Sequence, residues 1–185
     1  MAQGKIILLN GVSSAGKTTL SKALQEKLET PYYWLSEDVF REMTPAKFDN
    51  EDTEENEWIW INAIYGMYRT ARMYSDIGMN TIIDTVLDGP TFLDEAVELL
   101  HNYPILFVHV TCPLEELQKR EEERGDREIG LAEELLPRLY PLDGTYDIVV
   151  DTYKYTVEEC ADRIMGLLGC LEDFSAFKRL KERMK

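Results

Sequence analysis

The sequence predicts an α/β domain in which a mostly parallel sheet is covered by helices on both faces, giving three layers. Two observations lead to this fold class. Five apolar runs rich in β-branched residues recur along the 185 residues, and segments of helical length and spacing separate them. Strands that alternate with helix-length segments are typical of βα units, which build parallel sheets. No internal repeat, Gly/Ser-rich linker or shift in composition divides the chain, so we expect one domain over residues 1–185.

The five predicted strands are the apolar runs themselves. A strand inside a parallel sheet is buried on both faces, and it is therefore apolar almost throughout rather than alternating. In chain order the runs are KIILLN (5–10), YYWL (32–35), NTIIDTV (80–86), ILFVHVT (105–111) and YDIVVD (146–151).

Two of the intervening helices have recognisable ends. The first follows a glycine-rich loop directly and ends before Pro31. Its apolar face consists of Leu20, Ala23, Leu24 and Leu28. Near the other end of the chain, Thr156 and Glu159 have the spacing of a capping box at the start of a helix. The apolar stripe of that helix consists of Val157, Cys160, Ile164, Leu167 and Leu168.

Composition and charge narrow the functional classes. The net charge is −15, from 35 acidic and 20 basic side chains, so the surface should repel a phosphate backbone and nucleic acid is not an expected partner. No apolar run approaches the roughly 18 residues of a membrane span, and no signal peptide is apparent. Cys112, Cys160 and Cys170 form no close pair, which suits a reducing compartment. We expect a cytoplasmic protein without disulfides.

The last residues of the chain have the opposite charge. Residues 178–185 carry five basic side chains and one acid within a predicted C-terminal helical tail of about residues 170–185. Such a segment docks on an acidic surface of the same or another chain, or forms a solvated helix face.

The glycine-rich loop carries the clearest chemical signal. Gly11–Thr18, GVSSAGKT, fits the phosphate-binding pattern G-x-x-x-x-G-K-[ST] at every fixed position. Gly11 and Gly16 allow successive N–H groups to face a phosphate, and the next helix points its positive end there. Lys17 would reach the β- and γ-phosphates, and Thr18 would bind the bridging Mg²⁺. The predicted nucleotide contacts are Gly11, Ser13, Ser14, Ala15, Gly16, Lys17, Thr18 and Thr19.

The loop predicts ATP binding without naming the reaction. A chance glycine turn is the alternative, which the position between a strand and a helix disfavours. A guanine-reading N-K-x-D motif is absent, Asp84 begins DTVL rather than D-x-x-G, and no L-S-G-G-Q segment occurs. A GTPase switch and a transporter ATPase are therefore disfavoured. A small phosphoryl-transfer enzyme fits best.

Two acids follow predicted strands, where ligands of parallel sheets bind. Asp38 comes a short turn after the second strand, and Asp84 ends the apolar TIID of the third. Either carboxylate could accept the proton of an attacking hydroxyl or hold Mg²⁺ through water. For Asp38 the alternative is helix capping together with Ser36 and Glu37. Asp84 is harder to explain as a surface residue, and we assign it with Thr18 to the Mg²⁺ site.

A predicted lid of about residues 113–130 supplies arginines. Arg120 and Arg124 are four residues apart on one helix face, and Arg127 lies just past a Gly-Asp break. They could converge on the phosphates, with Arg120 as a nucleotide contact, and stabilise the charge that develops in transfer. The alternative is pairing along a solvated helix with the acids Glu116, Glu121 and Glu123.

The chain resembles the chloramphenicol phosphotransferase-like branch of the P-loop kinases. The matching blocks follow the family's order and cover much of residues 5–152. They are IILLNGVSSAGKTTL, WLSEDVFREMTP, TIIDTVLDG, VTCPLEELQKREEERGDREIGLA and TYDIVVDT. The resemblance implies a five-stranded parallel sheet of the P-loop NTPase type, as in nucleoside and shikimate kinases. It also implies transfer of the ATP γ-phosphate to a hydroxyl of a small molecule.

Residue roles carried over by motif are specific. Asp38 would be the general base, Lys17 and Thr18 the phosphate and Mg²⁺ contacts, and Arg124 and Arg127 the lid arginines. The chain departs from the family in the acidic segment 49–57 and the aromatic helix-like segment after it, and it lacks a histidine before YDIVVDT.

The departures concern the acceptor. The aromatic side chains Trp58, Trp60, Tyr65 and Tyr68 form either an acceptor wall or part of the core. The acidic segment either attracts a cationic acceptor or is a solvated loop. His101 and His109 are better explained as structural residues.

Together these patterns predict an ATP- and Mg²⁺-dependent kinase acting on a hydroxylated small molecule. The alternatives are another small P-loop kinase with a nucleoside, shikimate-like or sugar-acid acceptor, and a nucleotide-binding regulatory protein with slow hydrolysis. Whether the chain forms a homo-oligomer is left open.

Overall fold

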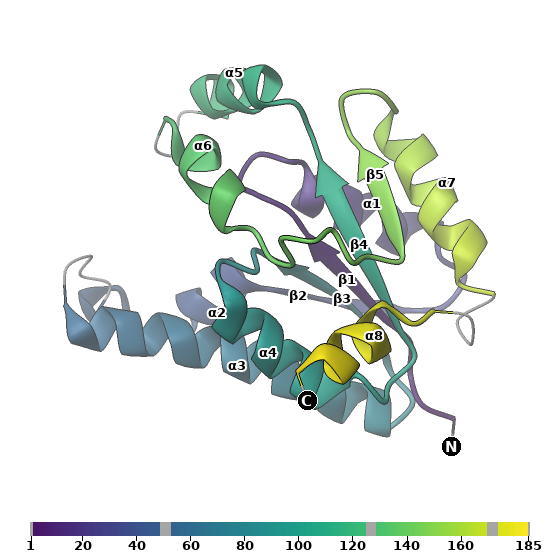
Figure 1. Ribbon diagram of the computed structural model, residues 1–185. Helices are drawn as coiled ribbons and strands as arrows, with labels where there is room; N and C mark the ends of the chain where they lie inside the picture. The colour runs from purple at the N-terminus through teal and green to yellow at the C-terminus, as the bar shows by residue number, and fades with distance from the viewer. Residues whose placement is uncertain (1, 49–52, 125–128, 170–173, 185) are drawn as a thin grey trace.

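The computed structural model describes residues 2–48, 53–124, 129–169 and 174–184 (Figure 1). Its centre is a five-stranded sheet in the order β2-β3-β1-β4-β5, in which every strand pair is parallel. The strands are β1 (Ile6–Asn10), β2 (Tyr32–Ser36), β3 (Asn80–Thr85), β4 (Ile105–Thr111) and β5 (Ile148–Asp151). The predicted α/β class and parallel sheet are confirmed.

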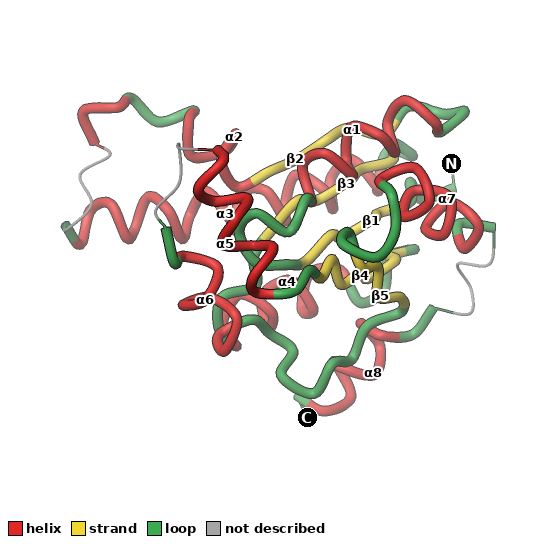
Figure 2. The backbone as a smooth tube through the Cα atoms, turned by 90° about the horizontal axis from the view of Figure 1, so that it is seen from above, coloured by secondary structure: helices red, strands yellow, loops and turns green. Residues whose placement is uncertain are grey.

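Helices cover both faces of the sheet (Figures 1 and 2). On one face, α1 packs against α7; on the other, α3 packs against α4 and α4 against α8. These helices are α1 (Lys17–Lys27), α3 (Glu54–Asp76), α4 (Pro90–Leu100), α7 (Val157–Leu167) and α8 (Ala176–Arg183).

The remaining helices lie toward the carboxyl ends of the strands (Figure 1). They are α2 (Glu37–Glu42), α5 (Leu114–Arg124), α6 (Leu131–Leu135) and the 3₁₀ turns η1 (Ala46–Phe48) and η2 (Leu136–Arg138). Of the predicted lid, residues 113–124, which include α5, and residues 129–130 are described, whereas residues 125–128 lie outside the described parts of the chain.

Strand β1 shows why the predicted strands are apolar throughout. Ile7 and Leu9 pack toward α1 and α7, while Ile6 and Leu8 pack toward α3 and α4, and all four are fully buried. Because β1 lies between β3 and β4, neither of its faces nor its edges reaches water. The polar residue of β1 is Asn10, the last of the strand, and the glycine-rich loop follows it.

The two helices with recognisable ends form as expected. α1 begins at Lys17 after Gly16, and α7 begins with a complete capping box in which the Thr156 hydroxyl accepts from the N–H of Glu159. In α7, Cys160 and Ile164 are fully buried. Cys112 is also buried, and neither thiol is in a disulfide; Cys170 lies outside the described residues.

The basic C-terminal helix α8 docks on acidic groups of the same chain. Phe177 is 2% exposed and meets the ring of Phe107 edge-on at 5.0 Å between centroids. Lys181 pairs with Glu98 of α4, and Arg183 pairs with Asp143. The amphipathic helix thus closes one end of the α3–α4 layer. None of the described helices is long and apolar enough to cross a membrane.

We expect Phe177→Ala to lower the free energy of unfolding by about 3–5 kcal/mol, because it leaves a cavity under α8. A urea titration measures this loss. Lys178→Ala, at an exposed position of the same helix, should change stability by no more than about 0.5 kcal/mol. Equal effects of the two substitutions would contradict the docking of α8.

Candidate active site

The loop between β1 and α1 owes its shape to two glycines. A Cβ at Gly11 would lie 2.3 Å from the carbonyl oxygen of Val110, so only glycine lets the loop pass this close to β4. Gly16 has a φ of 93°, in the left-handed region that favours glycine. Ser14 also has a positive φ, of 60°. This backbone brings the loop over the start of α1, in the arrangement that binds phosphate.

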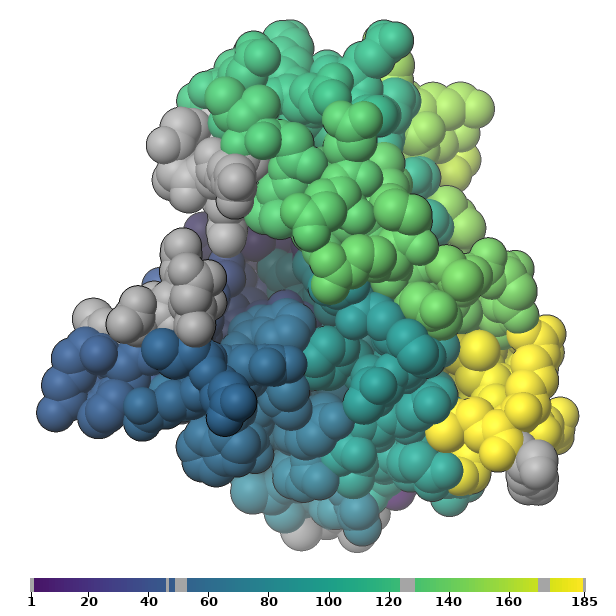
Figure 3. Space-filling model, turned by 60° about the vertical axis from the view of Figure 1, so that its left-hand side comes forward, coloured from purple at the N-terminus to yellow at the C-terminus, as the bar shows by residue number. Residues whose placement is uncertain are grey.

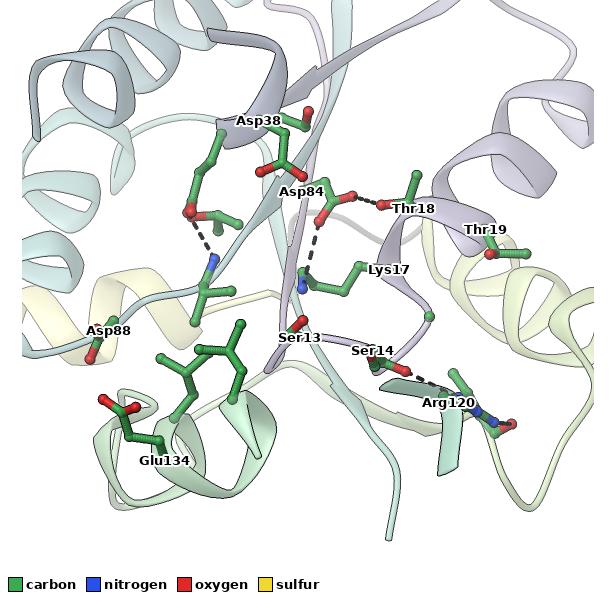
Figure 4. Close-up of a pocket in the computed structure, with 18 of the residues that line it drawn as sticks. Ser13, Ser14, Lys17, Thr18, Thr19, Asp38, Asp84, Asp88, Arg120 and Glu134 are labelled. Carbon is green, nitrogen blue, oxygen red and sulfur yellow. Dashed lines mark hydrogen bonds and ion pairs between the residues drawn. The ribbon is translucent and has the colours of Figure 1, made fainter. Parts of the chain in front are cut away.

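Lys17, Thr18 and Asp84 form one group beneath the loop, joined by a hydrogen bond and an ion pair (Figure 4). The Thr18 hydroxyl donates to Asp84 Oδ2 at 2.8 Å, and Lys17 Nζ lies 3.8 Å from Asp84 Oδ1. Lys17 also donates to the carbonyl of Val12 at 3.1 Å. Asp84 is 6% exposed at the end of β3, paired in register with Leu9 of β1. The fold thus brings together Thr18 and Asp84, which lie 66 positions apart in the sequence.

The residues present fit a nucleotide phosphate and Mg²⁺. Ser14 Oγ is buried and has no hydrogen-bond partner, and the buried Lys17 ammonium uses one of its three donors in a hydrogen bond. Such groups call for an oxygen-rich anion. Thr18 and Asp84 offer a hydroxyl and a carboxylate, and Mg²⁺ is usually held by one or two such groups together with phosphate oxygens and water. Within the described residues, no cluster of three His, Cys, Asp or Glu could hold a metal alone.

Arg120 joins α5 to the phosphate loop. Its guanidinium donates to the Thr152 hydroxyl at 3.0 Å and, more weakly, to the Ser14 carbonyl at 3.4 Å. The Thr152 hydroxyl in turn donates to the carbonyl of Ala15 at 2.9 Å. Arg120 also pairs with Glu116 at 3.0 Å. The predicted pairing along the helix therefore occurs, and Arg120 also reaches the loop backbone, while its contact with a nucleotide stays a prediction.

The other two lid arginines cannot be compared with the prediction. Arg124 is the last residue of α5, but its side chain lies outside the described part of the chain, as does the whole of Arg127. Their convergence on the phosphates stays a prediction.

Asp38 lies in the first turn of α2. Ser36 caps this helix, since its hydroxyl accepts from the N–H of Val39. Capping is therefore served by Ser36, and the exposed Asp38 side chain lines the same cavity as Lys17 and Asp84. In Figure 4 its carboxylate projects toward that pair. This placement of Asp38 agrees with its predicted position near the phosphate loop.

Glu37 is a site residue that sequence reasoning took only for a capping acid. Its Oε1 accepts hydrogen bonds from the Thr85 hydroxyl and from the N–H of Val86, the latter at 2.8 Å. Burial raises the pKa of Glu37 to about 7, against the opposing effects of these donors and of Lys17. The Thr85 hydroxyl also meets Tyr68 Oη at 3.3 Å, so a polar chain runs from α2 through β3 to α3.

A cavity of about 720 Å³ extends from the loop to the space between α2, α3 and α6. Figure 3 shows the corresponding recess between the green segment around α6 and the blue segment of α3. Its wall away from the loop is formed by Arg41, Trp60, Asp88, Leu131, Glu134, Leu135 and Arg138. The cavity is therefore large enough for a nucleotide phosphate tail and a small second molecule.

An ion-pair network shapes this far wall. Arg138 Nη2 contacts Asp88 Oδ2 at 2.7 Å, and its Nη1 contacts Glu134 at 2.9 Å. Asn10 fastens the same region, because its Oδ1 accepts from the N–H of Leu87 and its Nδ2 donates to the carbonyl of Tyr140. No sequence pattern indicated these contacts, which span up to 130 positions.

The aromatic segment divides between wall and core. Trp60 lines the cavity and meets the ring of Phe92 edge-on at 5.0 Å. Tyr65 packs against the same ring, Tyr68 is fully buried, and Trp58 is 66% exposed. Of the two predicted alternatives, Trp60 fits the wall, Tyr65 and Tyr68 fit the core, and the exposed Trp58 fits neither.

Both histidines are structural, as expected. The ring of His109 stacks on Tyr146 at 4.7 Å, and burial lowers its pKa. His101 Nδ1 lies 2.9 Å from the carbonyl of Val97. Neither lines the cavity beside the loop.

The parallel sheet, the phosphate loop and the acid at the end of β3 define a P-loop kinase. The chain belongs to the family described as chloramphenicol phosphotransferase-like protein, which it matches over residues 4–168. The "Putative O-phosphotransferase" of Mycobacterium tuberculosis strain H37Rv is 30% identical, over 99% of this chain and 90% of that protein. The adenylyl-sulfate kinase of Clostridium acetobutylicum is 28% identical, over 90% of this chain and 84% of that one.

Solved structures agree with this fold. The APS kinase CysC of Mycobacterium tuberculosis in complex with AMPPNP and APS has a TM-score of 0.69 at 16% identity, covering 91% of this chain and 99% of that chain. Shikimate kinase from Acinetobacter baumannii in complex with shikimate has a TM-score of 0.66 at 19% identity, covering 89% and 93%. At such identities the likeness establishes the fold alone.

The raised pKa of Glu37 predicts a pH-dependent stability. The folded value of about 7 lies above the ordinary 4.5, so the contribution of Glu37 is full below about pH 4.5 and is lost as pH rises through 7. Relative to Glu37→Gln, the native protein should lose on the order of 2 kcal/mol of unfolding free energy between pH 5 and pH 8. Urea titrations at the two pH values measure the difference.

The matched control is Glu42→Gln, which makes the same change at an exposed position of α2. It should follow the native protein across the pH range. Parallel pH profiles for the native protein and Glu37→Gln would show that Glu37 titrates normally.

Proposed function

We propose that the protein is an ATP- and Mg²⁺-dependent kinase that transfers the γ-phosphate to a hydroxyl of a small acceptor. One observation carries this proposal: Asp38 lines the same cavity as Lys17, Thr18 and Asp84. A carboxylate open to the cavity and a phosphate-binding group thus face one space that is large enough for both reactants.

On the phosphate side, the chain supplies positive charge and donors. The loop N–H groups, Ser14 and Lys17 would hold the β- and γ-phosphates, while Thr18 and Asp84 would hold Mg²⁺, which neutralises charge on the phosphate oxygens. Arg120 would keep the loop in place through Ser14 and Thr152. Arg124 and Arg127 would add charge from the lid, as the family resemblance implies.

On the acceptor side, Asp38 would act as general base. The acceptor oxygen bonds to the γ-phosphorus as the bond from that phosphorus to the ADP oxygen breaks, and the hydroxyl proton passes to Asp38. Asp38 suits this role because it is exposed to the cavity. The carboxylate of Asp84 contacts Thr18 and Lys17 and is assigned to the Mg²⁺ site.

ADP release with Mg·ATP tests the proposal against a panel of chloramphenicol, nucleosides, neutral sugars, aminoglycosides, shikimate, D-gluconate and adenylyl sulfate. We expect at least one acceptor to accelerate ADP release and to gain one phosphoryl group by mass. Lys17→Ala is the blank, because it removes the charge that reaches the phosphates. Slow ADP release that no acceptor accelerates would instead favour a regulatory nucleotide-binding protein.

Asp38→Asn should reduce kcat for the accepted substrate by about 10² to 10⁴, the usual contribution of a general base. Its affinity for ATP should change by no more than about twofold, because Asp38 is not part of the phosphate loop. Asp94→Asn, at an exposed position of α4 outside the cavity, is the control and should keep native activity. If Asp38→Asn kept the native turnover, a group other than Asp38 would take the proton of the substrate hydroxyl.

A further inference from the structure

Glu37 offers one oxygen to the cavity. Its Oε1 is fixed by the Thr85 hydroxyl and the Val86 N–H. Its Oε2 has no hydrogen bond or ion pair with any described residue. Solvent reaches this atom, because it is not one of the fully buried polar atoms that lack a partner. Because the side chain lines the cavity, the atom available to a ligand is Oε2. A carboxylate oxygen held in this way accepts a hydrogen bond strongly.

This oxygen belongs to the residue next to the proposed base. Neighbouring residues of a helix point about 100° apart, yet Glu37 and Asp38 both line the one cavity. Their Cα atoms are about 3.8 Å apart, as across any trans peptide. One small molecule that carries two hydroxyls can therefore meet both carboxylates.

The charges on the cavity wall away from the phosphate loop disfavour an anionic acceptor molecule. Arg138 is held between Asp88 and Glu134, and Arg41 already has a partner. Lys17 and Arg120 stand at the phosphate loop. The charge of Arg138 is thus balanced by two acids of the chain, and Trp60 provides an apolar surface.

We propose that Glu37 selects the acceptor by accepting a hydrogen bond from a second hydroxyl, adjacent to the one that is phosphorylated, so that the substrate is a neutral polyol with a vicinal diol. The inference rests on the proposed kinase function and narrows its substrate class. Glu37 touches the acceptor without taking its proton, and its role is specificity.

Glu37→Gln tests the contact with little disturbance of the fold. The amide oxygen can keep both hydrogen bonds of Oε1, and the amide nitrogen then replaces Oε2, turning an acceptor into a donor. Glu42→Gln on the same helix, which does not line the cavity, is the matched control. The probes are D-glucose and its 2-, 3- and 4-deoxy analogues, D-ribose and 2-deoxy-D-ribose, with shikimate and D-gluconate as anionic polyols.

Two readings are taken for each variant: kcat/KM for phosphorylation, and calorimetric binding of the probe in the presence of Mg·AMPPNP. At pH 8, above the raised pKa of Glu37, we expect the native protein and Glu42→Gln to prefer a neutral diol over the analogue that lacks the adjacent hydroxyl. The preference should be about 10- to 100-fold, the range for a hydrogen bond to a charged group. In Glu37→Gln, that ratio should fall to about threefold or less. The anionic polyols should be poor substrates throughout.

The outcomes separate this inference from the kinase proposal. Phosphorylation with the same diol preference in the native protein and Glu37→Gln overturns the role of Glu37 and leaves the kinase intact. Preference for an anionic polyol, or for a single hydroxyl, overturns the substrate class. Diol binding that depends on Glu37 without any turnover supports the contact and overturns the kinase. If no probe binds and no probe is phosphorylated, the inference is overturned.

Discussion

The burial of β1 between β3 and β4 is the constraint on which the rest of the site depends. A strand enclosed on both faces and both edges favours apolar side chains along its length, and β1 has its one polar side chain, Asn10, at its end. Polar groups therefore gather where the strands end, and the parallel register puts the end of β1 beside the end of β3. The phosphate loop and Asp84 meet for this reason, and the hydrogen bond from Thr18 to Asp84 fixes the start of α1 against the sheet.

Two carboxylates on adjacent residues of α2 illustrate how position decides chemistry. Glu37 turns toward β3, is fastened by Thr85 and Val86, and has a raised pKa. Asp38 stays exposed to the cavity. The same short helix thus presents a fixed, partly desolvated acid and an exposed one, a division that lets neighbouring acids serve different functions.

Much of the fold and part of the site were predictable from sequence, because their signals are local. The phosphate loop, the apolar strands and the capping box of Thr156 each occupy a few consecutive residues. Asp84 was predictable because a strand-terminal acid is unusual. Glu37 was not, since an acid in a first helical turn looks the same whether it caps or reaches a neighbouring strand. The Asp88–Arg138 pair joins residues 50 positions apart, and only the folded chain brings them together.

The docking of α8 has a practical consequence for handling the protein. This helix lies against α4, away from α5 and α6 and from the recess between α6 and α3 (Figures 1 and 3). A linker joined after it would leave from a side of the molecule that substrates need not cross. Surface immobilisation or an affinity tag at that point would keep the mouth of the cavity accessible, provided that the buried side chains Phe177 and Leu180 stay in place.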